Sequence, residues 1–167
     1  MGDGQTRMII ALNTNCHREQ KKWPHFAELA DKLHLEGDEV WFTGNNADKP
    51  YIENIIGRMQ HSENVVDVSG GTNLKTLAML MRRQFDMFVS INSGLLQMAI
   101  AMKVPTVAII GGMPARMVVP FNNPLVRFAE DPGLYSKPCK LRMEDISVDW
   151  ILELIRLSKG GGQEIRS

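Results

Sequence analysis

Residues 88–111 read Phe88-Val-Ser-Ile-Asn-Ser-Gly-Leu-Leu-Gln-Met-Ala-Ile-Ala-Met-Lys-Val-Pro-Thr-Val-Ala-Ile-Ile-Gly111, and they are the most informative part of the sequence. An apolar run ends at Asn92-Ser93-Gly94, a run rich in Ala, Met and Leu follows, and a second apolar run begins after Val104-Pro105. Short apolar runs bounded by turn residues are typical of buried strands, so the stretch predicts strand, tight turn, helix and strand. Because the turn would leave backbone N–H groups free at a helix N-terminus, it is a candidate site for an anion such as phosphate.

The same alternation extends on both sides of this stretch. Apolar runs predict strands at 8–12, 39–43, 65–68, 87–91 and 106–110, with a short sixth strand at 125–129. Apolar residues spaced three and four apart predict further amphipathic helices around 26–33, 52–59, 74–81 and 148–155. Strands that alternate with helices indicate a parallel sheet covered on both faces. Right-handed crossovers then give an α/β fold with a Rossmann-like doubly wound sheet of about six strands.

Turn and cap residues support these predicted limits. Pro24 suits the first turn of the first helix, and Gly37 suits the C′ position at its end. Thr72 or Asn73 would cap the third helix of the list, and Ser147 would cap the last one.

Length and composition favour one globular domain. The 167 residues suit a single domain, which we place at residues 8–158 between a flexible segment at 1–7 and a flexible Gly-rich tail at 159–167. Lys plus Arg equals Asp plus Glu at 19 each, which argues against a nucleic-acid partner. The sequence shows neither a signal peptide nor a membrane-spanning run, so we expect a cytoplasmic protein with at most peripheral membrane association.

The residues that most often hold metals do not form a ligand pattern here. Cys16 and Cys139 lack CxxC or Cys/His spacing and are expected to be free thiols. The four histidines, His17, His25, His34 and His61, fall on different predicted elements. We therefore expect no metal site, no cofactor and no catalytic histidine.

Three groups of residues are candidate ligand contacts, because each follows a predicted strand at the edge of the sheet where such folds bind ligands. The first is Asn92-Ser93-Gly94, which could instead be an ordinary turn with a Ser or Asn cap. The second is Lys21, which could neutralise a phosphate but could also be solvated beside Lys22. The third is Asp48, which could bind ribose hydroxyls or merely cap the following helix.

Several nucleotide and hydrolase motifs do not occur in the sequence. There is no GxGxxG, no Walker A loop, no GxSxG elbow and no HExxH. The sequence therefore argues against dinucleotide redox chemistry, P-loop phosphoryl transfer and serine hydrolysis. We expect the fold to bind another kind of nucleotide ligand.

Several segments, in this order and spacing, resemble the C-terminal, donor-binding half of glycosyltransferase family 9, the ADP-heptose:lipopolysaccharide heptosyltransferases. They are Ile9–Asn13, Lys21–Pro24, Phe26–Leu33, Glu39–Gly44, Val68–Leu74, Phe88–Gly94 and Val104–Gly111, followed by Pro138-Cys139. The resemblance implies half of a GT-B architecture: a Rossmann-like domain that holds a nucleotide sugar, with an ADP-sugar favoured.

The resemblance also implies roles for individual residues. Lys21, two positions before the Trp, would contact the donor diphosphate. The family's Asp-Ser/Thr-Gly turn, which binds the phosphates and the sugar, corresponds to Asn92, Ser93 and Gly94, and the usual histidine three residues later corresponds to Gln97. For the nucleoside, Gly71 and Thr72 would face the base, and Asp48 would lie at the ribose.

The resemblance leads to one main hypothesis and two alternatives. The chain would be the donor domain of an inverting, metal-independent glycosyltransferase, with the acceptor site and the catalytic base on an N-terminal half, so we assign no catalytic residue here. Because Asn92 and Gln97 replace an acid and a histidine of the family, the domain could instead be a non-catalytic nucleotide or nucleotide-sugar binding module. A third possibility is a ligand-free scaffold that self-associates into a homo-oligomer.

Overall fold

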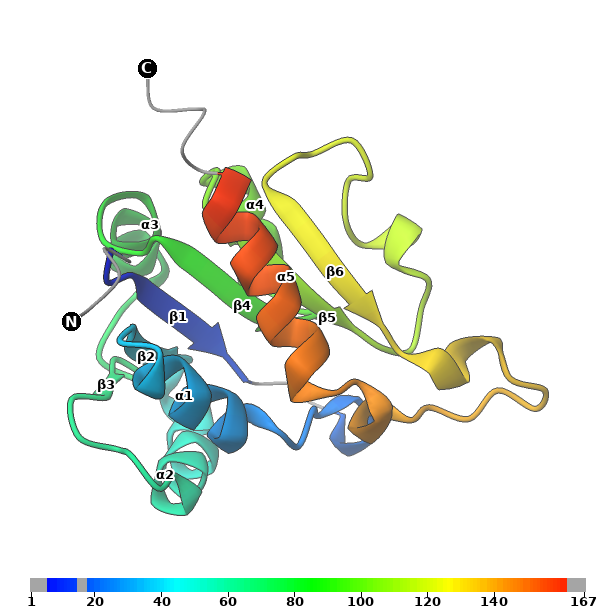
Figure 1. Cartoon of the computed structure of the whole chain (residues 1–167), viewed down its shortest axis with the longest axis horizontal. Coiled ribbons are helices and arrows are strands. Elements are labelled where there is room, and N and C mark those ends of the chain that lie inside the picture. The colour runs from blue at the N-terminus through cyan, green and yellow to red at the C-terminus, as the bar shows by residue number, and fades with distance from the viewer. Residues whose placement is uncertain (1–5, 15–17, 162–167) are drawn as a thin grey trace.

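The structure of the protein is a computed structural model that describes residues 6–14 and 18–161. Cys16, His17 and most of the two predicted terminal segments lie outside these ranges. Figure 1 shows a single layer of strands with helices packed on it.

The strands form one parallel sheet in the order β3-β2-β1-β4-β5-β6. They are β1 (Ile9–Asn13), β2 (Glu39–Thr43), β3 (Val66–Asp67), β4 (Met87–Ile91), β5 (Thr106–Ile110) and β6 (Val126–Glu130). This is the strand order of a Rossmann-like doubly wound sheet, so the predicted fold class is confirmed.

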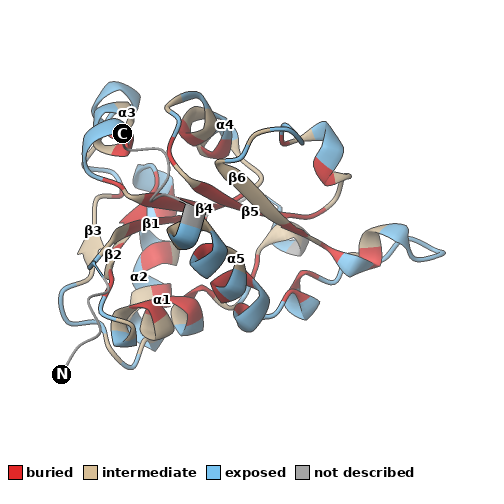
Figure 2. Cartoon of the chain, turned by 45° about the horizontal axis from the view of Figure 1, so that its top comes forward, coloured by how far each residue is buried: buried red, intermediate tan, exposed pale blue. Residues whose placement is uncertain are grey.

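Helices cover both faces of the sheet, as Figure 2 shows. They are α1 (Phe26–Leu35), α2 (Lys49–Arg58), α3 (Leu74–Arg83), α4 (Gly94–Ala101) and α5 (Val148–Gly161). Alternate side chains of each strand point to opposite faces, so Ile10 and Leu12 pack with α1, α2 and α5, whereas Ala11 packs with α3 and α4. Both sides of the central strands are therefore buried, which explains their continuous apolar sequences.

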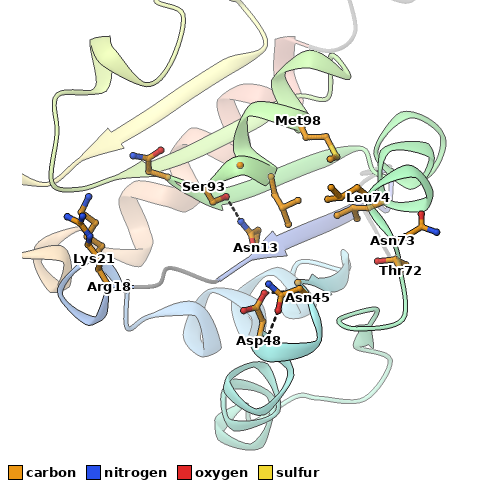
Figure 3. A pocket seen from close by; sticks show the side chains of 15 residues that line it. Asn13, Arg18, Lys21, Asn45, Asp48, Thr72, Asn73, Leu74, Ser93 and Met98 are labelled. Carbon is orange, nitrogen blue, oxygen red and sulfur yellow. Dashed lines mark hydrogen bonds between the residues drawn. The ribbon is translucent and has the colours of Figure 1, made fainter.

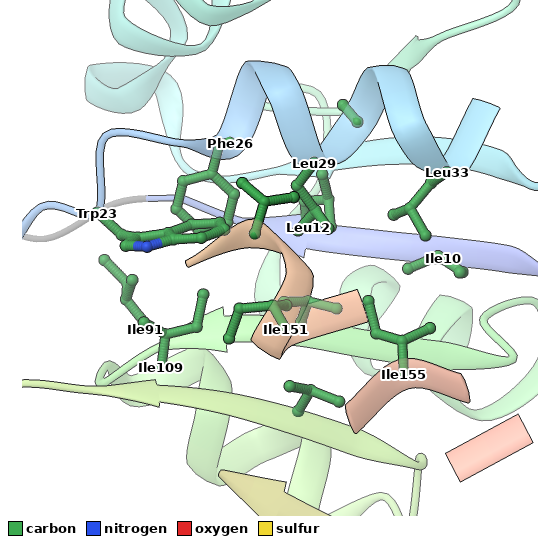
Figure 4. Packing of buried hydrophobic residues seen from close by; sticks show 14 of the residues in the cluster. Ile10, Leu12, Trp23, Phe26, Leu29, Leu33, Ile91, Ile109, Ile151 and Ile155 are labelled. Carbon is green, nitrogen blue, oxygen red and sulfur yellow. The ribbon is translucent and has the colours of Figure 1, made fainter. Parts of the chain in front are cut away.

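The larger half of the core lies under α1 and α5 (Figure 4). Trp23 is fully buried there; its ring packs edge-to-face on Phe26, and its Nε1 donates to the carbonyl oxygen of Ile146 at 2.8 Å. This bond joins the loop after β1 to the segment before α5, although 123 residues separate the two partners. Trp23 thus fixes the position of the loop that carries Lys21.

Several element limits differ from those predicted; β1, for instance, covers Ile9–Asn13 instead of 8–12. Strand β3 covers two residues instead of 65–68, because the Asp67 side chain accepts the Ser69 N–H at 2.8 Å and turns the chain. Strand β6 begins at Val126, because Asn123 Oδ1 accepts the Leu125 N–H. Pro24 precedes α1 rather than lying in its first turn, since the first helical bond runs from Leu29 N to the His25 carbonyl.

The predicted helix ends are otherwise sound. Gly37 has a φ of +90° just after α1, Asn73 rather than Thr72 caps α3 by accepting from Thr76 N, and Ser147 Oγ accepts from Trp150 N. Helix α5 runs to Gly161, three residues past the predicted end of the domain at 158. Lys159 Nζ lies 2.5 Å from Asp38 Oδ2, just before β2, and this ion pair holds the last turn of the helix.

Replacing Trp23 by Phe tests the anchoring bond. The variant keeps an aromatic ring but leaves the buried Ile146 carbonyl without its donor, so we expect the free energy of unfolding to fall by about 1–3 kcal/mol. The matched control is Trp150→Phe in α5, where the residue is 42% exposed and we expect a change below about 0.5 kcal/mol. Urea unfolding measures both; equal losses would contradict the role of the bond.

Candidate functional site: a cleft at the carboxyl edge of the sheet

A cleft of about 840 Å³ lies at the carboxyl ends of the central strands. The chain runs to one side of the sheet from β1 and to the other from β4, and this is where doubly wound sheets bind ligands. Figure 3 shows the lining side chains, which are Asn13, Arg18, Lys21, Gly44, Asn45, Asp48, Thr72, Asn73, Leu74, Leu77, Asn92, Ser93, Gly94, Leu95 and Met98.

The turn predicted to bind an anion lies in this cleft. Ser93 caps α4, and its Oγ accepts the Leu96 N–H at 3.3 Å. An added Cβ at Gly94 would meet nothing within 4 Å, so the backbone there stays open to a ligand. The first N–H groups of α4 and the positive end of its dipole therefore face the cleft, an arrangement that favours an anion.

Lys21 and Arg18 form the basic end of the cleft, to the left in Figure 3. Lys21 ends a short 3₁₀ helix, Glu19–Lys21, just before the buried Trp23. Its side chain lies directly over Gly112, which has a φ of +81° and no side chain to displace it. A Cβ at position 112 would overlap Lys21 Cε, so the glycine makes room for the lysine.

Lys22 has a different environment from its neighbour. Its Nζ lies 2.5 Å from Glu19 Oε1 and 4.3 Å from the centre of the Tyr51 ring. Burial raises the pKa of Tyr51, so this ring stays a neutral partner for the ammonium. Lys22 is therefore engaged on the surface next to the cleft, whereas Lys21 lines the cleft itself.

Asp48 both borders the cleft and takes part in a capping box, so its position agrees with each of the two roles considered for it, ligand contact and capping. It lines the cleft and is 6% exposed, and its Oδ2 accepts the Asn45 N–H at 2.8 Å. Asn45 Oδ1 in turn accepts from Ala47 N and Asp48 N, which completes a capping box around a 3₁₀ turn, Asn46–Asp48. Asp48 thus holds the loop after β2 while its carboxylate borders the cleft.

The end of the cleft opposite Lys21 is apolar, as the places of Leu74 and Met98 in Figure 3 show. Leu74 begins α3 and is 65% exposed, Leu77 follows on the same helix, and Leu95 and Met98 come from α4. The cleft therefore changes from cationic to apolar along its length, with hydrogen-bonding side chains between the two ends.

The structure brings most of the predicted site residues together. Lys21, Asp48, Thr72, Asn92, Ser93 and Gly94 all line the cleft. Gly71 is exposed beside Thr72 but is not a lining residue. Gln97 is not a lining residue either; its side chain donates from Nε2 to the carbonyl oxygen of Val118 at 2.9 Å.

Sequence reasoning missed several lining residues. Arg18 precedes Lys21 in the same loop, and its charge was the available signal. Asn45 and Asn73 looked like simple turn residues, and the leucines at the apolar end belong to regular helical stripes. Asn13 follows five apolar residues, and a polar side chain at the end of a buried strand was the signal that could have identified it.

Metal clusters and membrane-spanning helices are both absent from the part of the chain that the structure describes. They contain no group of three or more His, Cys, Asp and Glu side chains placed to hold a metal ion. Within residues 6–14 and 18–161, no helix combines the length and the apolar character needed to cross a membrane.

The sequence profile of glycosyltransferase family 9 (heptosyltransferase) matches residues 3–144. No curated protein sequence matches the chain significantly. Among solved structures, a family 9 glycosyl transferase from Veillonella parvula superposes with a TM-score of 0.81 at 20% identity, over 93% of this chain and 47% of its own. The E. coli ADP-heptose lipopolysaccharide heptosyltransferase II superposes with a TM-score of 0.78 at 23% identity, over 94% of this chain and 48% of its own.

A third structure, the E. coli heptosyltransferase WaaC with ADP, gives a TM-score of 0.76 at 14% identity over 93% of this chain and 46% of its own. The chain thus spans about half the length of the solved structures it resembles. At these identities the superpositions show that the fold is shared.

A pair of glycine variants tests the geometry of the cleft. Gly112→Ala places a Cβ on Lys21 Cε at a positive φ, so we expect the free energy of unfolding to fall by about 1–2 kcal/mol. Gly94→Ala, at the open start of α4, is expected to match the wild type or exceed it by up to about 1 kcal/mol. Chemical unfolding of both variants measures the difference. Because the flexible end of Lys21 can move aside, a Gly112→Ala variant as stable as the wild type would contradict the positive φ described at position 112.

Proposed function

The chain belongs to glycosyltransferase family 9, and from that premise we propose that its cleft binds the nucleoside diphosphate part of a nucleotide sugar. The proposal rests on two features that lie in the same cleft at the carboxyl edge of the sheet, the Lys21 side chain and the N-terminus of α4. A cation and a set of backbone N–H donors are the groups that bind a diphosphate. The cleft offers both without any rearrangement of the fold.

The remaining parts of the cleft suit the rest of such a ligand. The apolar surface of Leu74 and Met98 matches the faces of a nucleobase, and Thr72 lies beside it. Asp48, between the apolar and basic ends, is placed to accept from ribose hydroxyls. We favour an ADP-sugar, since WaaC, a protein of the same fold, is described in complex with ADP.

In the proposed reaction the chain acts on the leaving group. Lys21 and the first N–H groups of α4 stabilise the negative charge that develops on the nucleoside diphosphate as its bond to the sugar breaks. This preorganised charge serves in place of a metal ion. An acceptor hydroxyl attacks the opposite face of the sugar, which inverts its configuration, and the base and acceptor site lie on an N-terminal half, fused or separate. We expect such a protein to work in the cytoplasm, with at most peripheral membrane contact.

One observation favours a second candidate, a binding module without turnover. Asn92 and Gln97 stand where the resemblance expects an acid and a histidine. The Gln97 amide donates to the Val118 carbonyl and so connects α4 to the loop after β5 rather than lining the cleft. A domain with these two residues retains its binding groups but lacks two titratable ones.

Lys21→Ala, compared with Lys22→Ala, tests the diphosphate site. We expect Lys21→Ala to weaken ADP binding roughly tenfold or more and to make it less dependent on salt, because a charge-assisted contact to phosphate is lost. Lys22→Ala removes the same charge from the neighbouring residue, whose ammonium is engaged by Glu19 and Tyr51, so its effect is expected to be less than about twofold. Calorimetry at two salt concentrations measures both; equal effects would remove Lys21 from the site.

Turnover separates the two candidate functions. We expect the chain alone to bind ADP-heptose without transferring the sugar, and we expect transfer when a family 9 N-terminal half is supplied. Chromatography of the released ADP and of the glycosylated acceptor measures the reaction. Binding without turnover in both assays would contradict the enzyme and support the binding module, whereas full transfer by the chain alone would contradict the division of the active site.

A further inference from the structure

A chain of hydrogen bonds joins Asn13, Ser90 and Ser93 at the floor of the cleft. Asn13, at the end of β1 and 1% exposed, donates from Nδ2 to Ser90 Oγ at 2.9 Å and to Ser93 Oγ at 2.8 Å. Ser90, on the neighbouring strand β4 and fully buried, donates from its hydroxyl to the Ile91 carbonyl oxygen at 2.7 Å. Figure 3 shows the bond between Asn13 and Ser93.

The direction of this chain is fixed by a backbone group. A carbonyl oxygen can only accept, so the Ser90 hydroxyl must give its hydrogen to Ile91. Ser90 Oγ can therefore only accept from its other close neighbour, Asn13. If the Asn13 amide were turned over, two acceptor oxygens would face each other at 2.9 Å, so the nitrogen must point to the serines.

The same direction carries through to Ser93. Its Oγ accepts from Asn13 Nδ2 and from the backbone N–H of Leu96, and a hydroxyl oxygen has two lone pairs. Both are occupied, so the Ser93 hydroxyl can act on any further group only as a donor. Ser90 Oγ lies 3.4 Å from Ser93 Oγ, a longer contact than is usual for a hydroxyl pair, so an acceptor in the cleft at normal hydrogen-bond distance would take the Ser93 hydrogen instead.

We propose that Asn13 is a positioning residue that makes Ser93 an obligate hydrogen-bond donor, so that this point of the cleft takes a group that only accepts, such as a phosphate oxygen. This inference rests on the proposed function, because the acceptor we assign is the diphosphate of the nucleotide. A hydroxyl free to rotate would serve a donor or an acceptor equally; the chain from Ile91 removes that freedom and with it the entropy of orienting the group.

A double-mutant cycle tests whether Asn13 acts through Ser93. ADP binding is measured by calorimetry for the wild type, Asn13→Ala, Ser93→Ala and the double variant, and thermal unfolding of each confirms that it is folded. We expect Asn13→Ala to weaken ADP binding roughly tenfold in the wild-type background but less than about twofold in the Ser93→Ala background.

A reversal of the donor tests the direction. Asn13→Asp keeps the shape but offers only acceptor oxygens, which draw the Ser93 hydrogen away from the cleft. The matched control is Asn73→Asp, which adds the same charge to the same cleft at the cap of α3 without touching Ser93. We expect Asn13→Asp to weaken ADP binding at least roughly tenfold more than Asn73→Asp does.

Three results would overturn the inference. The absence of ADP binding by the wild type would remove the proposed function and this inference with it. Wild-type binding together with an equal effect of Asn13→Ala in both backgrounds would overturn the inference alone, since Asn13 would then act without Ser93. Equal losses in Asn13→Asp and Asn73→Asp would show that charge, and not donor direction, decides binding.

Discussion

The pairing of β1 with β4 sets the geometry of the whole cleft. These strands run parallel in a register that sets Asn13 beside Ser90. Both strands end at the same edge, so the loop that leads to Lys21 and the turn that begins α4 start side by side. A shift of this register by one residue would turn Asn13 and every apolar neighbour on β1 to the opposite face. The buried faces of the strand forbid that shift, and core packing thereby fixes the geometry of the cleft.

The core also explains why Lys21 is well placed although it is a long side chain on a loop. Trp23, two residues further along, is fully buried and bonded to the segment before α5. Gly112, two residues after the end of β5, leaves the space that the Lys21 side chain occupies. The flexible Lys21 side chain is thus confined between the buried Trp23 and the backbone of Gly112. Such confinement lowers the entropy lost when the ammonium contacts a ligand.

Much of this arrangement could be predicted from the sequence, and the reasons are local. The apolar runs around Ile10, Phe42 and Val89 identify buried parallel strands, since such strands are covered on both faces. Gly37 and Ser147 mark helix ends for local reasons. Glycine readily adopts the positive φ that follows a helix, and a serine hydroxyl accepts from a backbone N–H at a helix start. The position of Lys21 at the edge of the sheet follows from its place after the first strand.

Other parts depend on contacts between residues far apart in the chain. Nothing local shows that Asn13 meets Ser93, 80 residues later, or that Gln97 bonds to Val118 instead of lining the cleft. The limits of β3 and β6 were missed because the side chains of Asp67 and Asn123 compete with the strand for backbone N–H groups. Pattern reasoning therefore identified the elements and the edge that carries the site, whereas side-chain partners required the folded structure.

A titration of the isotope-labelled chain with ADP, followed through its backbone amide resonances, shows directly whether the cleft binds a nucleoside diphosphate. If the cleft binds a nucleoside diphosphate, the largest shifts will fall on Gly94, Leu95 and Leu96 at the start of α4, with further shifts near Lys21 and Thr72. A titration that leaves these amide resonances unchanged, or that shifts only resonances of residues on other surfaces, would contradict binding in this cleft.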